Sequence, residues 1–275
     1  MKVSIDLLCR KVIMSRQNYY KSHQRRRRKE VDDELVEKLV KVERASQPRL
    51  GGRKLYFMLK PELEDAGVSI GRDLFFEVLR TNNLLLGPLP RSPRTTNSRH
   101  SLPVFRNIIK GREITGPNQV WVSDITYIRT IEGFLYLSLI TDKYSRKIVG
   151  YNLGGTLETE ESMKALEMAL KTKPKGGHII HHSDRGCQYC SHLYVDKLEE
   201  NGFEISMTEE SHCSENALAE RVNGILKQEY WLGSTFRSKE QVHRAVEEAI
   251  HLYNTRRPHT SLNYKTPEQV HRMAA

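Results

Sequence analysis

The sequence predicts an α/β fold, a mixed β-sheet with flanking helices, preceded by a small all-helical N-terminal region. Residues 117–275 alternate between short apolar runs typical of strands and longer segments with helical periodicity, whereas residues 1–88 show helical periodicity only. The charge divides similarly: residues 1–116 hold 25 Lys and Arg against 13 Asp and Glu, and residues 117–275 hold 19 against 21. A segment of net charge +12 beside one of −2 indicates a polyanion-binding module joined to a metal-dependent core.

Residues 1–88 are predicted to be a helical, helix-turn-helix-like DNA-binding region. The first clear helix spans 31–43, and its apolar face is formed by Val31, Leu35, Leu39 and Val42. A second unit at 53–63 precedes a glycine-containing turn and a helix over 74–79, for which Ser69 is the expected N-cap. A run of five basic residues is expected to contact DNA phosphates, although such a run is equally typical of a solvated charged segment: Arg25, Arg26, Arg27, Arg28 and Lys29.

Residues 89–116 are predicted to be a basic, proline-rich linker. With Pro88 included, the segment contains four prolines and the polar run 94–99, a composition that favours an extended arm over a packed element. Residues 117–275 are then predicted to form the α/β core with a C-terminal helical extension, for the reasons that follow.

The elements of the core follow from hydrophobic periodicity and turn residues. Strands are predicted where β-branched and aromatic residues predominate, and turns at Glu132–Gly133 and at Asp142–Ser145. In chain order we expect strands at 119–129, 134–141 and 147–153, a helix at 158–171, a strand at 178–183, a helix at 192–201, a strand at 203–207 and a helix at 214–230. A last helix follows Ser238, with Gln241 as its capping-box partner, and ends near Asn254. This order matches the ribonuclease-H-like fold.

Three carboxylates in this pattern predict a phosphoryl-transfer site. Asp124 lies within a strand, Asp184 ends a strand, and Glu220 lies on a helix beside the apolar residues Leu218, Ala219 and Val222. Burying a carboxylate is costly unless a cation or hydrogen bonds compensate for it, so metal ligation explains these positions better than a structural role. Carboxylates from two strands and a helix can hold a pair of Mg²⁺ ions.

Asp142 competes with Asp184 for the role of second carboxylate, because it also follows an apolar strand directly. Its alternative role is that of a turn residue at the start of Asp142–Ser145, with Arg146 as a local charge partner. The turn interpretation is the stronger one.

Three further side chains lie near the face of Glu220 by helical periodicity: Asn216, Asn223 and Lys227. A lysine and two amides beside a metal-bound carboxylate are suited to contacts with DNA phosphates and bases. The alternative is a solvated helix face.

Several blocks of the sequence resemble one family, the B-frame products of bacterial insertion sequences, which are DDE transposases with a retroviral-integrase-type catalytic core. The blocks run in the family's order and are Trp121–Tyr127, Thr141–Gly150, His182–Tyr189, Glu215–Arg221, Tyr253–Leu262 and Thr266–Glu268, with a weaker one at Pro48–Leu55.

The resemblance implies that Asp124, Asp184 and Glu220 are catalytic and hold two Mg²⁺ ions, for which Mn²⁺ can substitute. It also supports Asp184 over Asp142. The implied activity is cleavage of double-stranded DNA at terminal inverted repeats and strand transfer into target DNA, by a homo-oligomer on DNA. A protein from an upstream reading frame is a further expected partner. The alternatives are a ribonuclease-H-like nuclease that does not join strands and an inactive DNA-binding relic or regulator.

A zinc site is a weaker alternative for a set of histidines and cysteines, because zinc fingers need two well-spaced ligand pairs and there is no second cysteine pair. The set is His181, His182, Cys187, Cys190, His192, His212 and Cys213. Neither a signal peptide nor a membrane-length apolar run is evident. The expected location is the cytoplasm of a bacterium, in association with the nucleoid.

Overall fold

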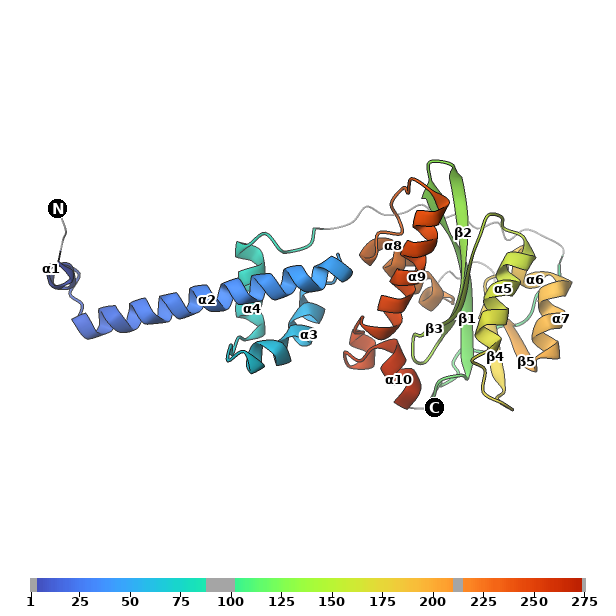
Figure 1. The fold of residues 1–275 in the computed structure, drawn as a ribbon. Helices are drawn as coiled ribbons and strands as arrows, with labels where there is room; N and C mark the ends of the chain where they lie inside the picture. Colours follow the sequence, from blue (N-terminus) through green and yellow to red (C-terminus); the bar gives the residue numbers. More distant parts are fainter. Residues whose placement is uncertain (1–3, 88–101, 210–214, 274–275) are drawn as a thin grey trace. The chain divides into compact units, whose positions relative to one another are not determined.

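A computed structural model describes residues 4–87, 102–209 and 215–273. The chain divides into two compact units, which are described separately (Figure 1). The first takes in the described residues up to Ser46 and Leu50–Gly87. The second takes in Gln47–Arg49 and the described residues from Leu102 onward.

The N-terminal unit is all-helical. Its helices are α1 (Ile5–Lys11), α2 (Arg16–Ser46), α3 (Gly52–Asp65) and α4 (Arg72–Thr81). The last three pack around one core, to which α2 contributes Val36 and Val40, both fully buried. The turn between α3 and α4 contains Gly67 at φ +77°, a left-handed conformation that glycine adopts without strain. The predicted succession of helix, tight turn and helix is therefore present.

Three sequence predictions for this unit differ from the structure. The buried face of α2 passes through Val36 and Val40, whereas Val42 is 64% exposed, because α3 and α4 cover a stripe displaced by one residue from the predicted one. Ser69 does not cap α4, which begins after Gly71 with no side-chain cap. The predicted helix 31–43 is part of the longer α2, which also contains Arg25–Lys29; their side chains lie outside the described part of the structure.

The C-terminal unit is built on a five-stranded mixed sheet in the order β3-β2-β1-β4-β5. The strands are β1 (Val120–Thr130), β2 (Gly133–Asp142), β3 (Ile148–Gly154), β4 (Ile179–Ser183) and β5 (Phe203–Met207). The first three form an antiparallel meander, and β4 and β5 run parallel to β1. All five lie within one or two residues of the predicted strands, so the predicted mixed sheet is confirmed.

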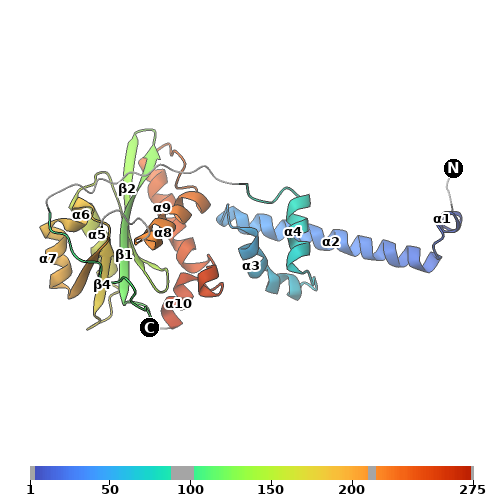
Figure 2. The ribbon, with the colours of Figure 1, turned by 180° about the vertical axis from the view of Figure 1, so that it is seen from behind.

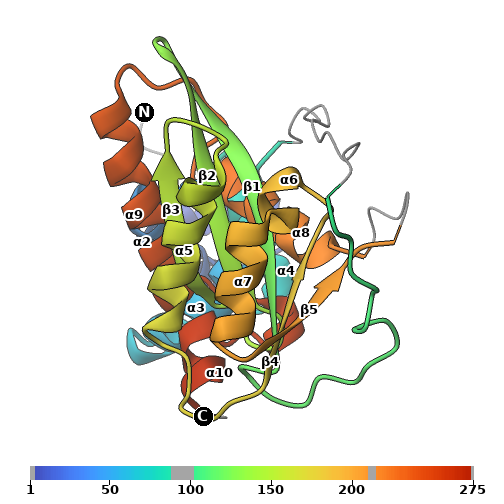
Figure 3. The ribbon, with the colours of Figure 1, turned by 90° about the vertical axis from the view of Figure 1, so that its right-hand side faces the viewer.

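Helices cover both faces of this sheet (Figures 1 and 2). One face carries α5 (Thr159–Leu170), the short α6 (Cys187–Cys190) and α7 (His192–Glu200), and Figure 3 shows α5 and α7 lying across the strands. The other carries α8 (Ala217–Glu229) and α9 (Lys239–Thr255), and α10 (Pro267–Met273) packs on α9. The sheet thus separates two apolar cores, one around Trp121 and Leu166 and one around Leu137 and Tyr253.

The second half of the predicted linker is part of this unit. Residues 88–101 lie outside the described residues, but Leu102 and Phe105 pack against the α5–α7 core. Ile109 is buried against Val120 and Ile180 on the α8 side of the sheet. The packed core therefore begins before residue 117, the predicted boundary.

No helix in the described ranges has the length and apolar character needed to cross a membrane.

Candidate active site

Asp124 and Asp184 lie side by side on neighbouring parallel strands. Strands β1 and β4 pair in parallel with Ser123 opposite Ser183. Asp124 follows Ser123 within β1, and Asp184 follows Ser183 directly after the end of β4. Neighbouring strands lie about 4.8 Å apart. Asp124 has the same side-chain parity as Val120 and Val122, which pack against Ala219, so it faces α8.

The electrostatic surroundings of Asp124 are unfavourable for its charge. Partial burial is the main factor that raises the pKa of Asp124 to about 7, and the negative charge of Asp184 is the next. The carboxylate accepts hydrogen bonds from the Asn223 side-chain amide at 2.8 Å and from the backbone N–H of Ile125 at 3.0 Å. These bonds lower the pKa but do not offset the other two effects, so the site carries negative charge that the protein does not neutralise.

Asp184 is held at the end of β4 by the backbone that follows it. The Gly186 N–H donates to Asp184 Oδ1 at 3.0 Å, and a Cβ at Gly186 would lie close to that oxygen. Arg185 donates to the Thr208 carbonyl at 2.7 Å, and Gln188 to the Leu157 carbonyl at 2.7 Å. Hydrogen bonds therefore fix the conformation of the segment His182–Tyr189, which holds the Asp184 carboxylate beside Asp124.

Glu220 lies in the first turn of α8 and is exposed, which corrects the prediction that apolar neighbours enclose it. Ala219 and Val222 turn toward the sheet and leave Glu220 outside. Its charge still contributes to the raised pKa of Asp124, as the smallest of the causes. Within residues 4–87, 102–209 and 215–273, no three His, Cys, Asp or Glu side chains lie close enough together to hold a metal ion.

The two amides near Glu220 have partners inside the protein. Asn216, the N-cap residue of α8, donates to the Ser123 carbonyl at 3.0 Å and is 4% exposed. Asn223 is 6% exposed and donates to Asp124. Neither lies on a solvated face, so that alternative is wrong for both, and their contact with DNA stays a prediction.

Lys227 is half-buried, with its ammonium group 4.1 Å from the centre of the Tyr127 ring. Burial lowers its pKa, while the charge of Asp124 acts in the opposite direction. The ammonium is therefore positioned over an aromatic face near the aspartate pair, within the field of their negative charge.

Buried polar groups beneath the aspartates were not identified as functional from the sequence. His181 bonds to Ser123 Oγ at 2.7 Å and to Tyr194 OH at 3.1 Å, and burial lowers its pKa to about 3. The hydroxyl of Tyr189 is buried without a hydrogen-bond partner in the described structure, and its pKa is raised by burial first and then by Tyr194 and the two aspartates. These groups fill the space under the site with neutral hydrogen-bonding side chains.

The residues considered as zinc ligands contact other groups in the structure. His182 bonds to Ser206 Oγ at 2.9 Å, and buried Cys190 lies 3.6 Å from the sulfur of Met207. Cys187 is exposed. His212 and Cys213 lie outside the described residues.

The block Tyr253–Leu262 has a structural role that sequence reasoning missed. Arg257, 2% exposed, donates through Nε and NH2 to the two carboxylate oxygens of Glu229, both at 2.8 Å. Its NH1 lies 2.9 Å from His259 Nε2, and the guanidinium lies 5.9 Å from the centre of the Tyr253 ring. Since Glu229 is the last residue of α8, this network anchors the helix that carries Glu220.

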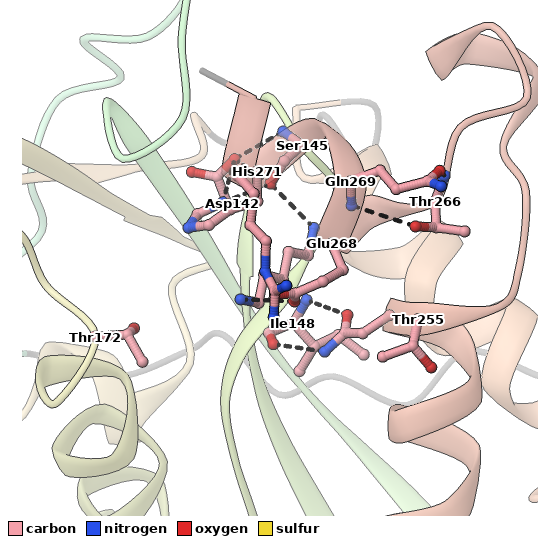
Figure 4. A network of polar contacts seen from close by, with 12 residues as sticks. Asp142, Ser145, Ile148, Thr172, Thr255, Thr266, Glu268, Gln269 and His271 are labelled. Carbon is pink, nitrogen blue, oxygen red and sulfur yellow. Dashed lines mark hydrogen bonds and ion pairs between the residues drawn. The ribbon is translucent and has the colours of Figure 1, made fainter. Parts of the chain in front are cut away.

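Asp142 is a turn residue. It is fully buried, and it accepts bonds from the Asn118 N–H and from the N–H and hydroxyl of Ser145, each at 2.7 Å. Figure 4 shows the network extending through Ser145 to His271 of α10. Arg146 donates to the Lys143 carbonyl and forms no ion pair with Asp142, but the charge of Asp142 opposes the lowering of the Arg146 pKa by burial, so the predicted charge interaction is present without a direct contact.

The donor set at the aspartate pair fits a divalent cation such as Mg²⁺. Two carboxylates face the same side of the sheet, and their mutual repulsion raises a pKa that a cation would lower. Oxygen-only ligands of this kind suit hard cations. Glu220 stands close enough to influence Asp124 but outside a common ligand set.

Comparison with known proteins identifies the family. Residues 114–213 and 201–267 each match an integrase core domain family. The chain is 35% identical, over 98% of its length and all of the relative, to the Insertion element IS600 uncharacterized 31 kDa protein of Shigella sonnei. It is 31% identical to Transposase InsF for insertion sequence IS3fB of Escherichia coli (strain K12), over 97% of this chain and 93% of that protein.

The fold is also that of a solved integrase. The chain is similar to one in the cryo-electron microscopy structure of the simian T-cell lymphotropic virus intasome in complex with PP2A regulatory subunit B56 gamma. The TM-score is 0.50 at 19% identity, over 80% of this chain and 74% of that chain. This likeness and the mixed sheet confirm the predicted ribonuclease-H-like fold, and the chain belongs to the insertion-sequence transposases, DDE-type polynucleotidyl transferases with an integrase core domain.

Proposed function

We propose that this transposase cuts DNA at the ends of its insertion sequence and joins those ends to target DNA, with Asp124, Asp184 and Glu220 as the catalytic carboxylates. The observation that carries the proposal is the aspartate pair, Asp124 within β1 and Asp184 directly after β4, where burial and then the charge of Asp184 raise the pKa of Asp124 to about 7. Such a pair is costly to the fold, and perturbed carboxylates of this kind concentrate at functional sites.

The three carboxylates would hold two Mg²⁺ ions, and Mn²⁺ could substitute. When bound, such ions activate a water or a 3′-hydroxyl and stabilise the leaving oxygen of an in-line displacement. Glu220 would join the aspartates through a rotamer change of its exposed side chain, since Asn216 holds the start of α8 to β1.

The chain's own residues would position the carboxylates and the DNA. Asn223 orients the carboxylate of Asp124 through its 2.8 Å bond, and Asn216 ties the start of α8 to the strand that carries Asp124. Lys227, whose charge lies near the pair, would contact a phosphate of the substrate. Direct contact of Asn216 and Asn223 with DNA stays part of the proposal, beside these positioning roles.

The partners follow from this reaction. The substrates are double-stranded DNA with the element's terminal inverted repeats and a target DNA. Two ends must be handled together, so the active form would be a homo-oligomer on DNA, associated with the bacterial nucleoid. The N-terminal helical unit, with the run Arg25–Lys29 in α2, would supply DNA affinity, and a protein from an upstream reading frame could add to it.

The test is incubation of the full chain with Mg²⁺ and DNA that carries the element's ends, scored for cleavage and for joining. Asp124→Asn, Asp184→Asn and Glu220→Gln should each abolish both reactions while DNA binding persists, because they keep the side-chain shape and remove the charge. A variant with near-normal activity would exclude that residue as a ligand. Cleavage without joining by the wild-type chain would instead indicate a nuclease.

A further inference from the structure

A cavity of about 470 Å³ lies at the turn between β2 and β3. Three separate parts of the C-terminal unit line it: the segment before β1, the β2–β3 turn, and the segment around the start of α10. Each contributes positive charge, through Arg112, Lys143, Arg146 and Lys265. No Asp or Glu is among the lining residues. We call this feature the basic cavity.

The cations of the basic cavity lack the close ion pairs that their neighbours form in the described residues; burial lowers the pKa of Arg146, and the charge of Asp142 acts in the opposite direction. Next to the cavity, Lys147 and Arg272 pair with Glu268 at 2.8 and 2.6 Å. Within the described residues none of the four cations of the basic cavity forms an ion pair, and the nearby carboxylate of Asp142 is buried and occupied by Ser145 and the Asn118 N–H. Residues 117–275 carry a net charge of −2, so this concentration of positive charge is local and not a property of the unit.

Two features of the basic cavity are unfavourable to folding: the closeness of its positive charges and the left-handed backbone of some of its residues. Burial and the neighbouring guanidinium of Arg146 lower the pKa of Lys143, and burial lowers the pKa of Arg146. Arg146 has φ +67° and Asn263, on the opposite wall, φ +52°, left-handed conformations that an arginine adopts rarely. A ligand that brings negative charge would offset the repulsion, and this is how anion sites are built.

The basic cavity is close enough to the aspartate pair to contact the same nucleic acid. Asp142, at the end of β2, is paired with Trp121, three residues before Asp124 on β1. At about 3.3 Å per residue, the turn lies roughly 10 Å along the sheet from Asp124. The rise of a DNA strand is about 3.4 Å per nucleotide, so this distance corresponds to about three nucleotides.

We propose that the basic cavity binds backbone phosphates of the DNA on which the transposase acts, as a contact separate from the catalytic carboxylates. The inference rests on the proposed function for the identity of the polyanion. The cavity is partly open to solvent and its cations come from three chain segments, a layout that suits a strand passing along the surface.

The experiment uses the full chain and a labelled duplex that carries the element's end. The cavity variant is Lys143→Ala with Lys265→Ala. The matched control is Lys239→Ala with Arg244→Ala, two exposed cations on α9 that do not line the cavity. Fluorescence anisotropy at a series of salt concentrations gives the slope of log affinity against log salt for each protein, and thermal unfolding without DNA gives each Tm.

We expect the slope for the cavity variant to be shallower than that of the wild type by about 1 per lysine, and the control slope to be unchanged. We also expect the Tm of the DNA-free cavity variant to equal or exceed the wild-type value, because the substitutions remove like-charge repulsion. An unchanged slope, or a lower Tm that accounts for weaker binding, would overturn the proposal and assign the four cations a structural role.

The strand-transfer assay separates this inference from the proposed function. A cavity variant that keeps the wild-type salt slope, beside a wild-type chain that cuts and joins, would refute the DNA contact alone. A shallower slope with a wild-type chain that neither cuts nor joins would support the contact and refute the proposed reaction. If the wild-type chain did not bind DNA, both would be wrong.

Discussion

At the scale of the residue, the aspartate pair stores electrostatic repulsion that a simple structural role would not require. Asn223 and the Ile125 N–H supply two hydrogen bonds to Asp124, yet its pKa still rises to about 7. Folding therefore disfavours the charged form of this carboxylate. In our proposal catalysis requires that charge, so stability and catalysis make opposite demands here, and this opposition can be measured.

The free energy of unfolding of the wild type should fall as the pH rises through the pKa of Asp124, and Asp124→Asn should abolish this fall. The pKa of Asp124 is about 7 in the folded chain against an ordinary value of 3.8. The protonated carboxyl therefore adds to the free energy of unfolding below about pH 4, and this contribution is lost as the pH rises toward 7. The difference at pH 8 is up to about 4 kcal/mol. Urea unfolding of both proteins in EDTA from pH 5 to 8 measures it.

The comparison between the two proteins isolates Asp124. His181 and His182 have lowered pKa values, of about 3 and about 4, and so contribute a stability that increases with pH in both proteins. Mg²⁺ at pH 8 should raise the free energy of unfolding of the wild type more than that of Asp124→Asn. Parallel pH profiles would show that the charge of Asp124 costs the fold nothing.

Lys227→Ala should weaken engagement of DNA at the active site without loss of a carboxylate. Its ammonium group is held 4.1 Å from the centre of the Tyr127 ring, and its removal should make the salt dependence of DNA binding shallower by about one counterion. Lys239→Ala serves as the control. If both the salt slope and the activity were unchanged, Lys227 would be a packing residue over Tyr127.

At the scale of the element, α8 is fixed at both ends by residues outside the helix. Asn216 binds the helix start to the Ser123 carbonyl, and Arg257 binds Glu229 at its end. The first turn of α8 therefore lies between two anchors, with Ala219 buried and the side chain of Glu220 exposed. This placement leaves Glu220 room to approach the aspartates while the rest of α8 stays packed.

Gly150 allows α5 to lie against β3. A Cβ there would overlap the Ala165 carbonyl oxygen and approach the Ala169 side chain, and the backbone oxygen cannot yield as the end of a flexible side chain can. Gly150→Ala should lower the free energy of unfolding by about 1–3 kcal/mol or more. Gly155→Ala is the control, because a Cβ there meets nothing within 4 Å. Equal stability of the two variants in urea unfolding would contradict this packing.

At the scale of the whole molecule, cutting the chain should separate DNA affinity from chemistry. The cut must fall earlier than the predicted boundary of the core, since Ile109 is buried and Phe105 packs against the α5–α7 core. A fragment of residues 102–275 should fold and bind DNA poorly at moderate salt, because most of the positive charge lies before it. Residues 1–101 should bind DNA and never cut it.

Mobility shifts of both fragments at two salt concentrations, with circular dichroism to establish folding, would decide the matter. If residues 102–275 bound DNA as tightly as the whole chain, the N-terminal unit would not be the main source of affinity.

The sheet was predictable because each strand carries a local signal: alternating β-branched residues, closed by a turn such as Glu132–Gly133. The aspartate pair was less predictable, because Asp142 and Asp184 both follow apolar strands and the resemblance to the transposase family was needed to favour Asp184. The exposure of Glu220 and the burial of Asn223 depend on how α8 is rotated about its axis against the sheet. Helical periodicity fixes that rotation only to within about one residue, so it does not decide which side chains face the sheet. The basic cavity is lined by three segments that lie far apart in the sequence, so no local sequence pattern predicts it.

The Arg257–Glu229 pair sets an order of events during synthesis. Glu229 leaves the ribosome before Arg257, and until the arginine and His259 follow, the end of α8 lacks its partner. A chain interrupted between the two would contain all three carboxylates yet hold the Glu220 helix at one end only. The helix that carries Glu220 is therefore held at both ends only after the chain has been synthesised through Arg257.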